Sequence, residues 1–179
     1  MAKSKTIRTR RKASETESIR LVINGQTYDL NIGSRPGEVE VFHTLAHTLR
    51  ETLGLRGTKV SCDHAACGAC TVIMDGRAVL SCKMLTVECD GTAITTIEGL
   101  ANPATGRLDP LQQAFVDHTA FQCGFCTPGM IMTARALLNR NSQPSEDEVR
   151  EALSGNFCRC VSHYHVIRAV MSVARSEAT

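Results

Sequence analysis

The sequence predicts an α+β protein, in which an N-terminal part built on a small β-sheet precedes a C-terminal bundle of four helices. Two observations indicate this order: alternating apolar residues flank Asn-Gly and Asp-Gly turns in the first hundred residues, and proline and serine helix starts follow in the rest. A third observation is that eight of the nine cysteines fall into two groups of four, one in each part. Each part can therefore hold a metal site of its own.

The first predicted element is a β-hairpin over residues 19–30. Apolar residues alternate along it, and the Asn24-Gly25 dipeptide at its centre is typical of a type I′ turn. Leucines then recur every four residues over positions 45–53, which predicts a helix that ends near Gly54. The helix is expected to cross the sheet before the first cysteines.

A second predicted hairpin joins residues 72–74 to residues 78–80 through Asp75-Gly76. It places Cys82 on a returning strand, beside the loop that carries the three cysteines before it. Hairpin, helix and loop together predict a β-grasp domain. The segment 101–106 contains Asn, Pro and Gly and reads as a linker, so the boundary is expected near residue 102.

The second part of the chain shows helix starts at regular intervals. Asp109-Pro110 and Thr127-Pro128 place proline in a first helical turn, and Ser145 with Glu148 forms a capping box. A last helix carries valines at helical spacing over residues 166–174. Four such helices predict a bundle, with two pairs of cysteines at helix ends.

We therefore expect a disordered basic arm over residues 1–17, a β-grasp domain over 18–101 and a helical domain over 102–179. Six of the 20 Lys and Arg residues lie in the first twelve positions, which contain no acid, and the remaining 14 face 18 Asp and Glu. Because the positive charge is a tail and not a patch on the fold, nucleic acid is not expected to be the main partner. The alternative for the arm is contact with a polyanion or a partner protein.

The cysteines and the first residues also indicate a compartment. Arg10-Arg11 is followed by Lys12 and polar residues, not by the apolar stretch of an export signal. No run approaches the roughly 18 apolar residues of a membrane helix, so no membrane span is expected. Nine cysteines without a signal peptide predict a cytoplasmic protein that uses thiols for metal. Cys89 belongs to neither group and is interpreted as a small buried or unpaired thiol.

The first group of cysteines has the spacing of a plant-type 2Fe-2S ligand loop. Three cysteines are separated by four and two residues, and the fourth is distant. The group consists of Cys62, Cys67, Cys70 and Cys82. Gly68 and Ala69 are small, so their backbone amides can approach the cluster sulfurs. The N-terminal part is accordingly predicted to be a plant-type ferredoxin domain.

The second group suits another 2Fe-2S cluster and consists of Cys123, Cys126, Cys158 and Cys160. Cys126 directly precedes a helix start, whose free amides and positive dipole end stabilise an anionic cluster. Zinc in a four-thiolate tetrahedron is the alternative for this group, but the loop spacing of the first group disfavours zinc for the pair of sites. His64, His163 and His165 lie near the cysteines, and eight cysteines already satisfy two clusters.

Four stretches of the chain carry a resemblance to a known family. They are Cys67-Gly68-Ala69-Cys70-Thr71-Val72, Thr96-Ile97-Glu98-Gly99-Leu100, Gln122-Cys123-Gly124-Phe125-Cys126-Thr127-Pro128-Gly129-Met130 and Gly155-Asn156-Phe157-Cys158-Arg159-Cys160. With these stretches the chain resembles the small iron-sulfur subunit of xanthine oxidase-type molybdenum hydroxylases, such as carbon monoxide dehydrogenase, isoquinoline oxidoreductase and 4-hydroxybenzoyl-CoA reductase. The resemblance extends over about residues 18–175.

The resemblance implies a heterotrimer, often doubled into a dimer of heterotrimers. A large subunit would carry molybdenum in molybdopterin cytosine dinucleotide, and a medium subunit would carry FAD. This chain would link them electronically, with its second cluster beside the pterin and its first nearer the flavin. Gln122 and Cys160 match family positions that approach the pterin amine. No catalytic residue is expected on this chain.

Some residues depart from the pattern of the family. Ser61 and Ala65 stand where glycine is usual, and Val161-Ser162-His163 replaces the common Thr-Gly-Tyr. If position 65 needs a left-handed backbone, alanine there costs about 1 to 2 kcal/mol. None of these changes removes a predicted ligand.

Three functions are compatible with these features of the sequence. The leading one is an electron-transfer subunit of a molybdenum-dependent dehydrogenase or hydroxylase. The second is a free-standing two-cluster ferredoxin-like carrier, which would need an exposed and usually acidic docking patch. The third is a zinc-stapled interaction module, which would be colourless where 2Fe-2S proteins are red-brown.

Overall fold

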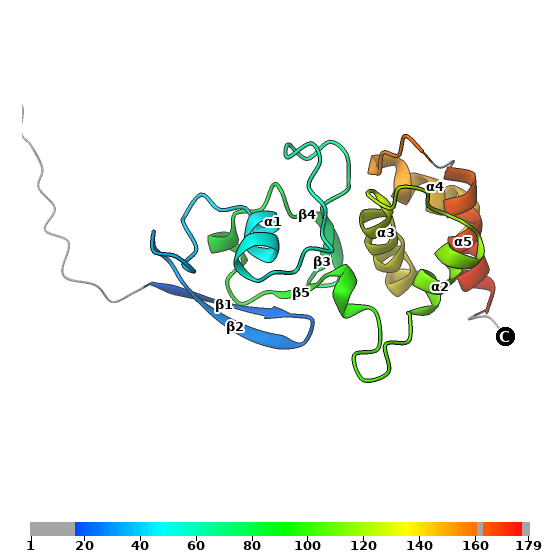
Figure 1. Cartoon of the computed structure of the whole chain (residues 1–179). Helices are drawn as coiled ribbons and strands as arrows, with labels where there is room; N and C mark the ends of the chain where they lie inside the picture. The colour runs from blue at the N-terminus through cyan, green and yellow to red at the C-terminus, as the bar shows by residue number, and fades with distance from the viewer. Residues whose placement is uncertain (1–16, 161–162, 177–179) are drawn as a thin grey trace, which may run out of the picture.

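A computed structural model of the chain describes residues 17–160 and 163–176 (Figure 1). The strands are β1 (Ser18–Ile23), β2 (Gln26–Asn31), β3 (Thr71–Met74), β4 (Arg77–Leu80) and β5 (Ala93–Thr95). The helical elements are α1 (Leu45–His47), η1 (Thr48–Thr52), η2 (Thr86–Cys89), η3 (Ile97–Gly99), α2 (Pro110–Asp117), α3 (Thr127–Arg140), α4 (Glu146–Ala152), η4 (Leu153–Gly155) and α5 (His163–Ser176). The predicted basic arm lies outside the described residues, apart from Glu17.

Both predicted hairpins are confirmed. Strand β1 pairs with β2, and β3 pairs with β4, each in antiparallel register. Positive φ angles of 52° at Asn24 and 80° at Gly25, and of 48° at Asp75 and 79° at Gly76, give both turns the left-handed backbone that type I′ requires. The sheet order is β2-β1-β5-β3-β4, because β5 lies between the two hairpins and runs parallel to β1.

The predicted helix over 45–53 exists but is irregular. Its first turn, α1, is α-helical with Thr44 as the N-cap, and the next turn, η1, is a π-helix. Leu45 and Leu49 are fully buried in the core formed with the sheet, where they meet Leu21 and Val72. The chain therefore crosses the sheet in two short turns before the cysteine loop.

The predicted starts of the later helices are confirmed. Asp109 and Ser145 cap α2 and α4 through complete capping boxes, and α3 begins with proline in its first turn. The valines of α5 are buried in a core that also holds residues of α2, α3 and α4. Within the described residues, no helix is long and apolar enough to span a membrane.

The sheet and the helices pack against each other through α3. In Figure 1, α3 is the helix that faces β3 and β4, and α2 and α5 lie on its far side. Ile73 of β3 packs with Met132 and Ala136 of α3 in a buried apolar cluster. This contact brings the start of α3 close to the loop that carries Cys67 and Cys70.

Candidate metal centres

The first group of cysteines lies on one side of the sheet, at the end facing α3. Three of its thiols are on the loop between η1 and β3, and Cys82 lies in the turn just after β4. The prediction that Cys82 lies on a strand is therefore wrong by two residues, because β4 ends at Leu80. The thiols lie as two neighbouring pairs, because Cys67 acts on the pKa of Cys62 and Cys82 acts on the pKa of Cys70.

The cysteine loop turns sharply because three of its residues have positive φ angles. These are 54° at Asp63, 64° at Ala65 and 72° at Gly68. The condition stated for position 65 is thus met: its backbone is left-handed, and the alanine there is strained. Ser61 is not among the residues with positive φ, so its backbone does not require glycine.

The curled loop directs backbone amides at the first thiol. Hydrogen bonding from the backbone near His64 and from the Ala66 amide, whose nitrogen lies 3.3 Å from the Cys62 sulfur, lowers the pKa of Cys62 to about 6. Burial has the opposite effect at the other end of the loop and raises the pKa of Cys70 to about 11. Metal binding would have to displace the proton of Cys70, whereas the lowered pKa of Cys62 favours its thiolate form.

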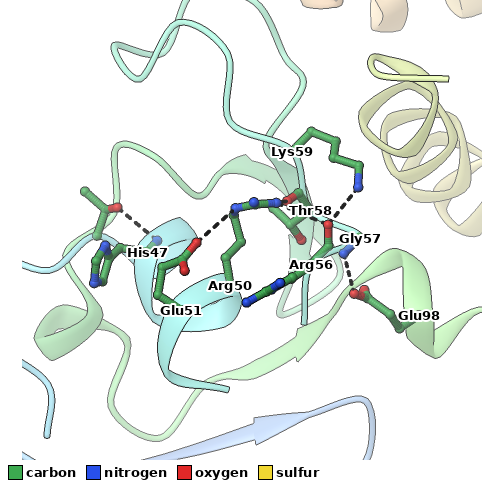
Figure 2. Close-up of polar contacts among 9 residues, drawn as sticks. His47, Arg50, Glu51, Arg56, Gly57, Thr58, Lys59 and Glu98 are labelled. Atoms are coloured by element: carbon green, nitrogen blue, oxygen red, sulfur yellow. Dashed lines mark hydrogen bonds and ion pairs between the residues drawn. The ribbon is translucent and has the colours of Figure 1, made fainter. Parts of the chain in front are cut away.

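The segment leading into the cysteine loop is clamped from two sides (Figure 2). Arg50 donates to the carbonyl oxygens of Arg56 and Thr58 at 3.1 and 2.7 Å. Glu98 accepts from the Gly57 amide at 2.6 Å and from the Thr96 hydroxyl. Sequence reasoning missed both clamps, although Glu98 belongs to a stretch that carried the family resemblance.

The second group of cysteines lies at the starts of two helices. Cys123 and Cys126 precede α3, and Cys158 and Cys160 lie between η4 and α5. The sulfurs of Cys123 and Cys160 are 3.6 Å apart, and Cys158 is the neighbouring thiol of Cys126. Cys123 and Cys160 are exposed at the protein surface, while Cys126 and Cys158 are half-buried.

Two thiols of the second group, both just before α3, have pKa values that are shifted in opposite directions. Hydrogen bonding from the Phe125 backbone lowers the pKa of Cys123, whereas burial and the neighbouring Cys158 raise that of Cys126 to about 12. The hydroxyl oxygen of Thr127 is buried and has no hydrogen-bond partner within the described part of the chain. A buried hydroxyl without a partner costs free energy, so this group suits a bound acceptor such as a cluster sulfur.

The arrangement of the thiols fits two-iron clusters better than single ions. All nine cysteines lie in the described ranges and none forms a disulfide. The eight grouped thiols lie in four pairs, and a 2Fe-2S cluster takes two thiolates on each of its two irons.

The amino-acid sequence matches two families of iron-sulfur domains. Residues 6–117 match the family described as 2Fe-2S iron-sulfur cluster binding domain, and residues 96–171 match the family described as 2Fe-2S binding domain. The small subunit of nicotine 6-hydroxylase from Paenarthrobacter nicotinovorans is 47% identical over 143 residues, which cover 80% of this chain and 85% of that protein. The small FeS subunit of nicotinate dehydrogenase from Eubacterium barkeri is 42% identical over 150 residues, covering 83% of this chain and 94% of that protein.

A solved structure agrees with these relatives. The crystal structure of quinoline 2-oxidoreductase from Pseudomonas putida 86 contains a chain that is 43% identical, with a TM-score of 0.82, covering 92% of this chain and 96% of that one. The chain belongs to the family of small iron-sulfur subunits of molybdenum hydroxylases. It is an electron-transfer subunit of an oxidoreductase, as the resemblance implied.

Two further residues predicted for this iron-sulfur subunit lie at the exposed edge of the second group. Gln122 and Cys160 are both exposed, and Gln122 directly precedes Cys123. Of the segment that departs from the family pattern, Val161 and Ser162 lie outside the described residues, and His163 is the first residue of α5. The pterin contact predicted for Gln122 and Cys160 stays a prediction.

Cys89 and His64, which lie outside the two groups of four cysteines, both contact backbone carbonyl oxygens. Cys89 is fully buried in the core of the sheet, where its thiol donates to the Leu85 carbonyl and burial raises its pKa to about 11. The His64 ring contacts the carbonyl oxygen of Cys62. Neither residue adds a thiol or imidazole to a cysteine pair.

Proposed function

We propose that this subunit holds two 2Fe-2S clusters and passes electrons between two partner chains, of which the large subunit carries molybdopterin cytosine dinucleotide and the medium subunit carries FAD. Cys62, Cys67, Cys70 and Cys82 would hold the first cluster, and Cys123, Cys126, Cys158 and Cys160 the second. The observation that carries this proposal is the gathering of eight thiols into four pairs. When bound, each cluster supplies a one-electron relay.

The residues of this chain hold and tune the clusters without performing substrate chemistry. Amides on the curled first loop and at the start of α3 are placed to donate to anionic sulfur. Arg50 and Glu98 keep the entry to the first loop in place. The substrate and its turnover would belong to the large subunit.

Exposed apolar side chains near both cysteine groups support a permanent subunit over a diffusible carrier. Phe125 and Phe157, 45% and 62% exposed, adjoin cysteines of the second group. Val41 and Phe42 are 62% and 65% exposed, and Phe42 lines a hollow of about 380 Å³ that also touches Asp63 of the first loop. Aromatic residues are enriched at protein interfaces, whereas a free carrier needs a charged docking patch.

We place the large subunit on the second group and the medium subunit on the first. Exposed Cys123 and Cys160 with Gln122 would face the pterin, and the hollow beside the first loop would face the flavin subunit. The complex would be a dimer of heterotrimers, with residues 18–101 and 102–179 of this chain forming its two domains. The nine cysteines without a disulfide support a cytoplasmic location.

The test is the composition of the native complex. The chain would be tagged in its own cells and purified under mild conditions, with metals, flavin and co-purifying polypeptides determined. About four iron atoms per chain, together with molybdenum, FAD and a large and a medium polypeptide, are expected. Iron on a solitary chain without molybdenum or flavin would favour the free carrier, and a colourless zinc protein would exclude the clusters.

A further inference from the structure

The two cysteine groups meet at a single stretch of backbone. The amide of Phe157, just before Cys158, donates to the carbonyl oxygen of Cys67 at 3.0 Å. The side-chain amide of Asn156 donates to the carbonyl oxygen of the next residue, Gly68, at 3.1 Å. The loop of the second group is thus bonded directly to the loop of the first.

Asn156 is one of the few buried polar residues of the protein, with 3% of its surface exposed. Burying a side-chain amide is unfavourable unless it is hydrogen-bonded. The Gly68 carbonyl oxygen also accepts from Thr71, so the carbonyl lies in a fixed orientation. The hydrogen bond from Asn156 therefore fixes the distance between the backbones of the two cysteine loops.

The packing at this point leaves no room for adjustment. A Cβ atom on Gly68 would lie 2.5 Å from Asn156 Nδ2 and 2.6 Å from the carbonyl oxygen of Gly155. A Cβ atom on Gly129, in the first turn of α3, would lie 2.2 Å from the Gly68 carbonyl oxygen. Segments from both groups are in backbone contact, and the Asn156 side chain fills the space that remains between them.

We propose that Asn156 is a positioning residue that fixes the separation of the two cluster sites and thereby the rate of electron transfer between them. The inference rests on the proposed function, because it takes both cysteine groups as cluster sites. Electron tunnelling and the magnetic interaction between two reduced clusters both fall steeply with distance. If the contact between the two cysteine loops opened slightly, tunnelling and the magnetic interaction would both weaken, although every cysteine would stay in its own loop.

The test uses the purified complex with Asn156→Asp and Asn156→Ala. Asp keeps the shape of the side chain but turns an oxygen toward the Gly68 carbonyl, and Ala removes the donor altogether. The matched control is Asn24→Gly, which removes a side-chain amide that exchanges hydrogen bonds with Thr96 inside the sheet part. Glycine suits the left-handed backbone of position 24.

The readouts are iron content, the magnetic splitting in the electron paramagnetic resonance spectrum of the reduced protein, and the rate of reduction of the first cluster after the second. We expect both Asn156 variants to keep their iron, to show a smaller splitting and to slow transfer several-fold. The Asn24→Gly control is expected to lower thermal stability with unchanged splitting and rate.

Unchanged splitting and rate in both Asn156 variants would overturn the inference. Selective loss of the second cluster in both variants, but not in the control, would also overturn it, because Asn156 would then build the second site and not set the spacing. A wild-type complex without iron at either group would refute the proposed function itself, which separates that failure from a failure of the inference.

Discussion

The two cysteine groups differ in how much of each the chain itself encloses. In the first group, Cys70 and Cys82 are buried, at 3% and 5% exposed, against the end of the sheet. In the second group, Cys123 and Cys160 are exposed. The other two thiols of each group are half-buried, so the first site is more enclosed by its own domain than the second. Of the two sites, the second is therefore the more accessible from outside this chain.

The difference follows from the local structures that supply the thiols. A single loop curls around the first site and a hairpin returns to close it. The second site is assembled from the start of α3 and from the segment between η4 and α5, and neither curls around the thiols as the first loop does. Two of its four thiols therefore stay exposed on this chain.

The largest expected effect is the loss of a single site. Cys123→Ser should remove the second cluster and about half the iron, and should abolish electron flow from substrate, because a thiolate of one iron is lost. The first cluster should stay assembled, since its four thiols lie on other segments. Iron analysis and electron paramagnetic resonance would measure both. Cys89→Ala is the matched control and should retain all iron; loss of both clusters in Cys123→Ser would contradict the independence of the two sites.

The next largest effect is expected in how fast each cluster is lost from the protein. When the chain is separated from its partners and treated with an iron chelator, the second cluster should be lost several-fold faster than the first, because two of its ligands are exposed. The decay of the two resonance signals with time measures this. In the intact complex the two rates should become similar, and equal rates in the isolated chain would show that exposure does not control loss.

A smaller effect is expected at the hydroxyl that has no partner in the described residues. Thr127→Val keeps the shape of the side chain and removes a donor next to Cys126, so the reduction potential of the second cluster should become more negative. Redox titration followed by electron paramagnetic resonance would measure it. Thr27→Val, on the edge strand β2, is the control and should leave both potentials unchanged. A shift of the first cluster's potential instead would assign the hydroxyl to the other site.

The smallest effect concerns the strained loop of the first site. Ala65→Gly should raise the free energy of unfolding by about 1 kcal/mol, since residue 65 has a φ of 64°. Chemical denaturation would measure the change. Ala66→Gly, at a neighbouring residue that is not among those with positive φ, should be neutral or destabilising. A stabilisation by both substitutions would show that the strain at Ala65 is not the cause.

Much of the fold could be predicted because its signals are local. Asn24-Gly25 and Asp75-Gly76 specify their turns by the φ angles that these residues tolerate, and Asp109 and Ser145 specify helix starts by capping. The cysteine spacing likewise identified the chemistry of the sites. Strand β5 escaped prediction because it has three residues and gains its place only by pairing with β1 and β3. The π-helical turn η1 also has no local signal.

The sequence by itself determined the turns, the caps and the ligand chemistry, because each depends on residues a few positions apart. Only the tertiary structure decided which thiols pair, that Glu98 holds Gly57, and that Asn156 is bonded to Gly68. Those contacts join residues far apart in the chain, and no periodicity or spacing encodes them. The Asn156 bond forms because the packing of α3 on β3 buries polar groups that must find partners between the two parts of the chain.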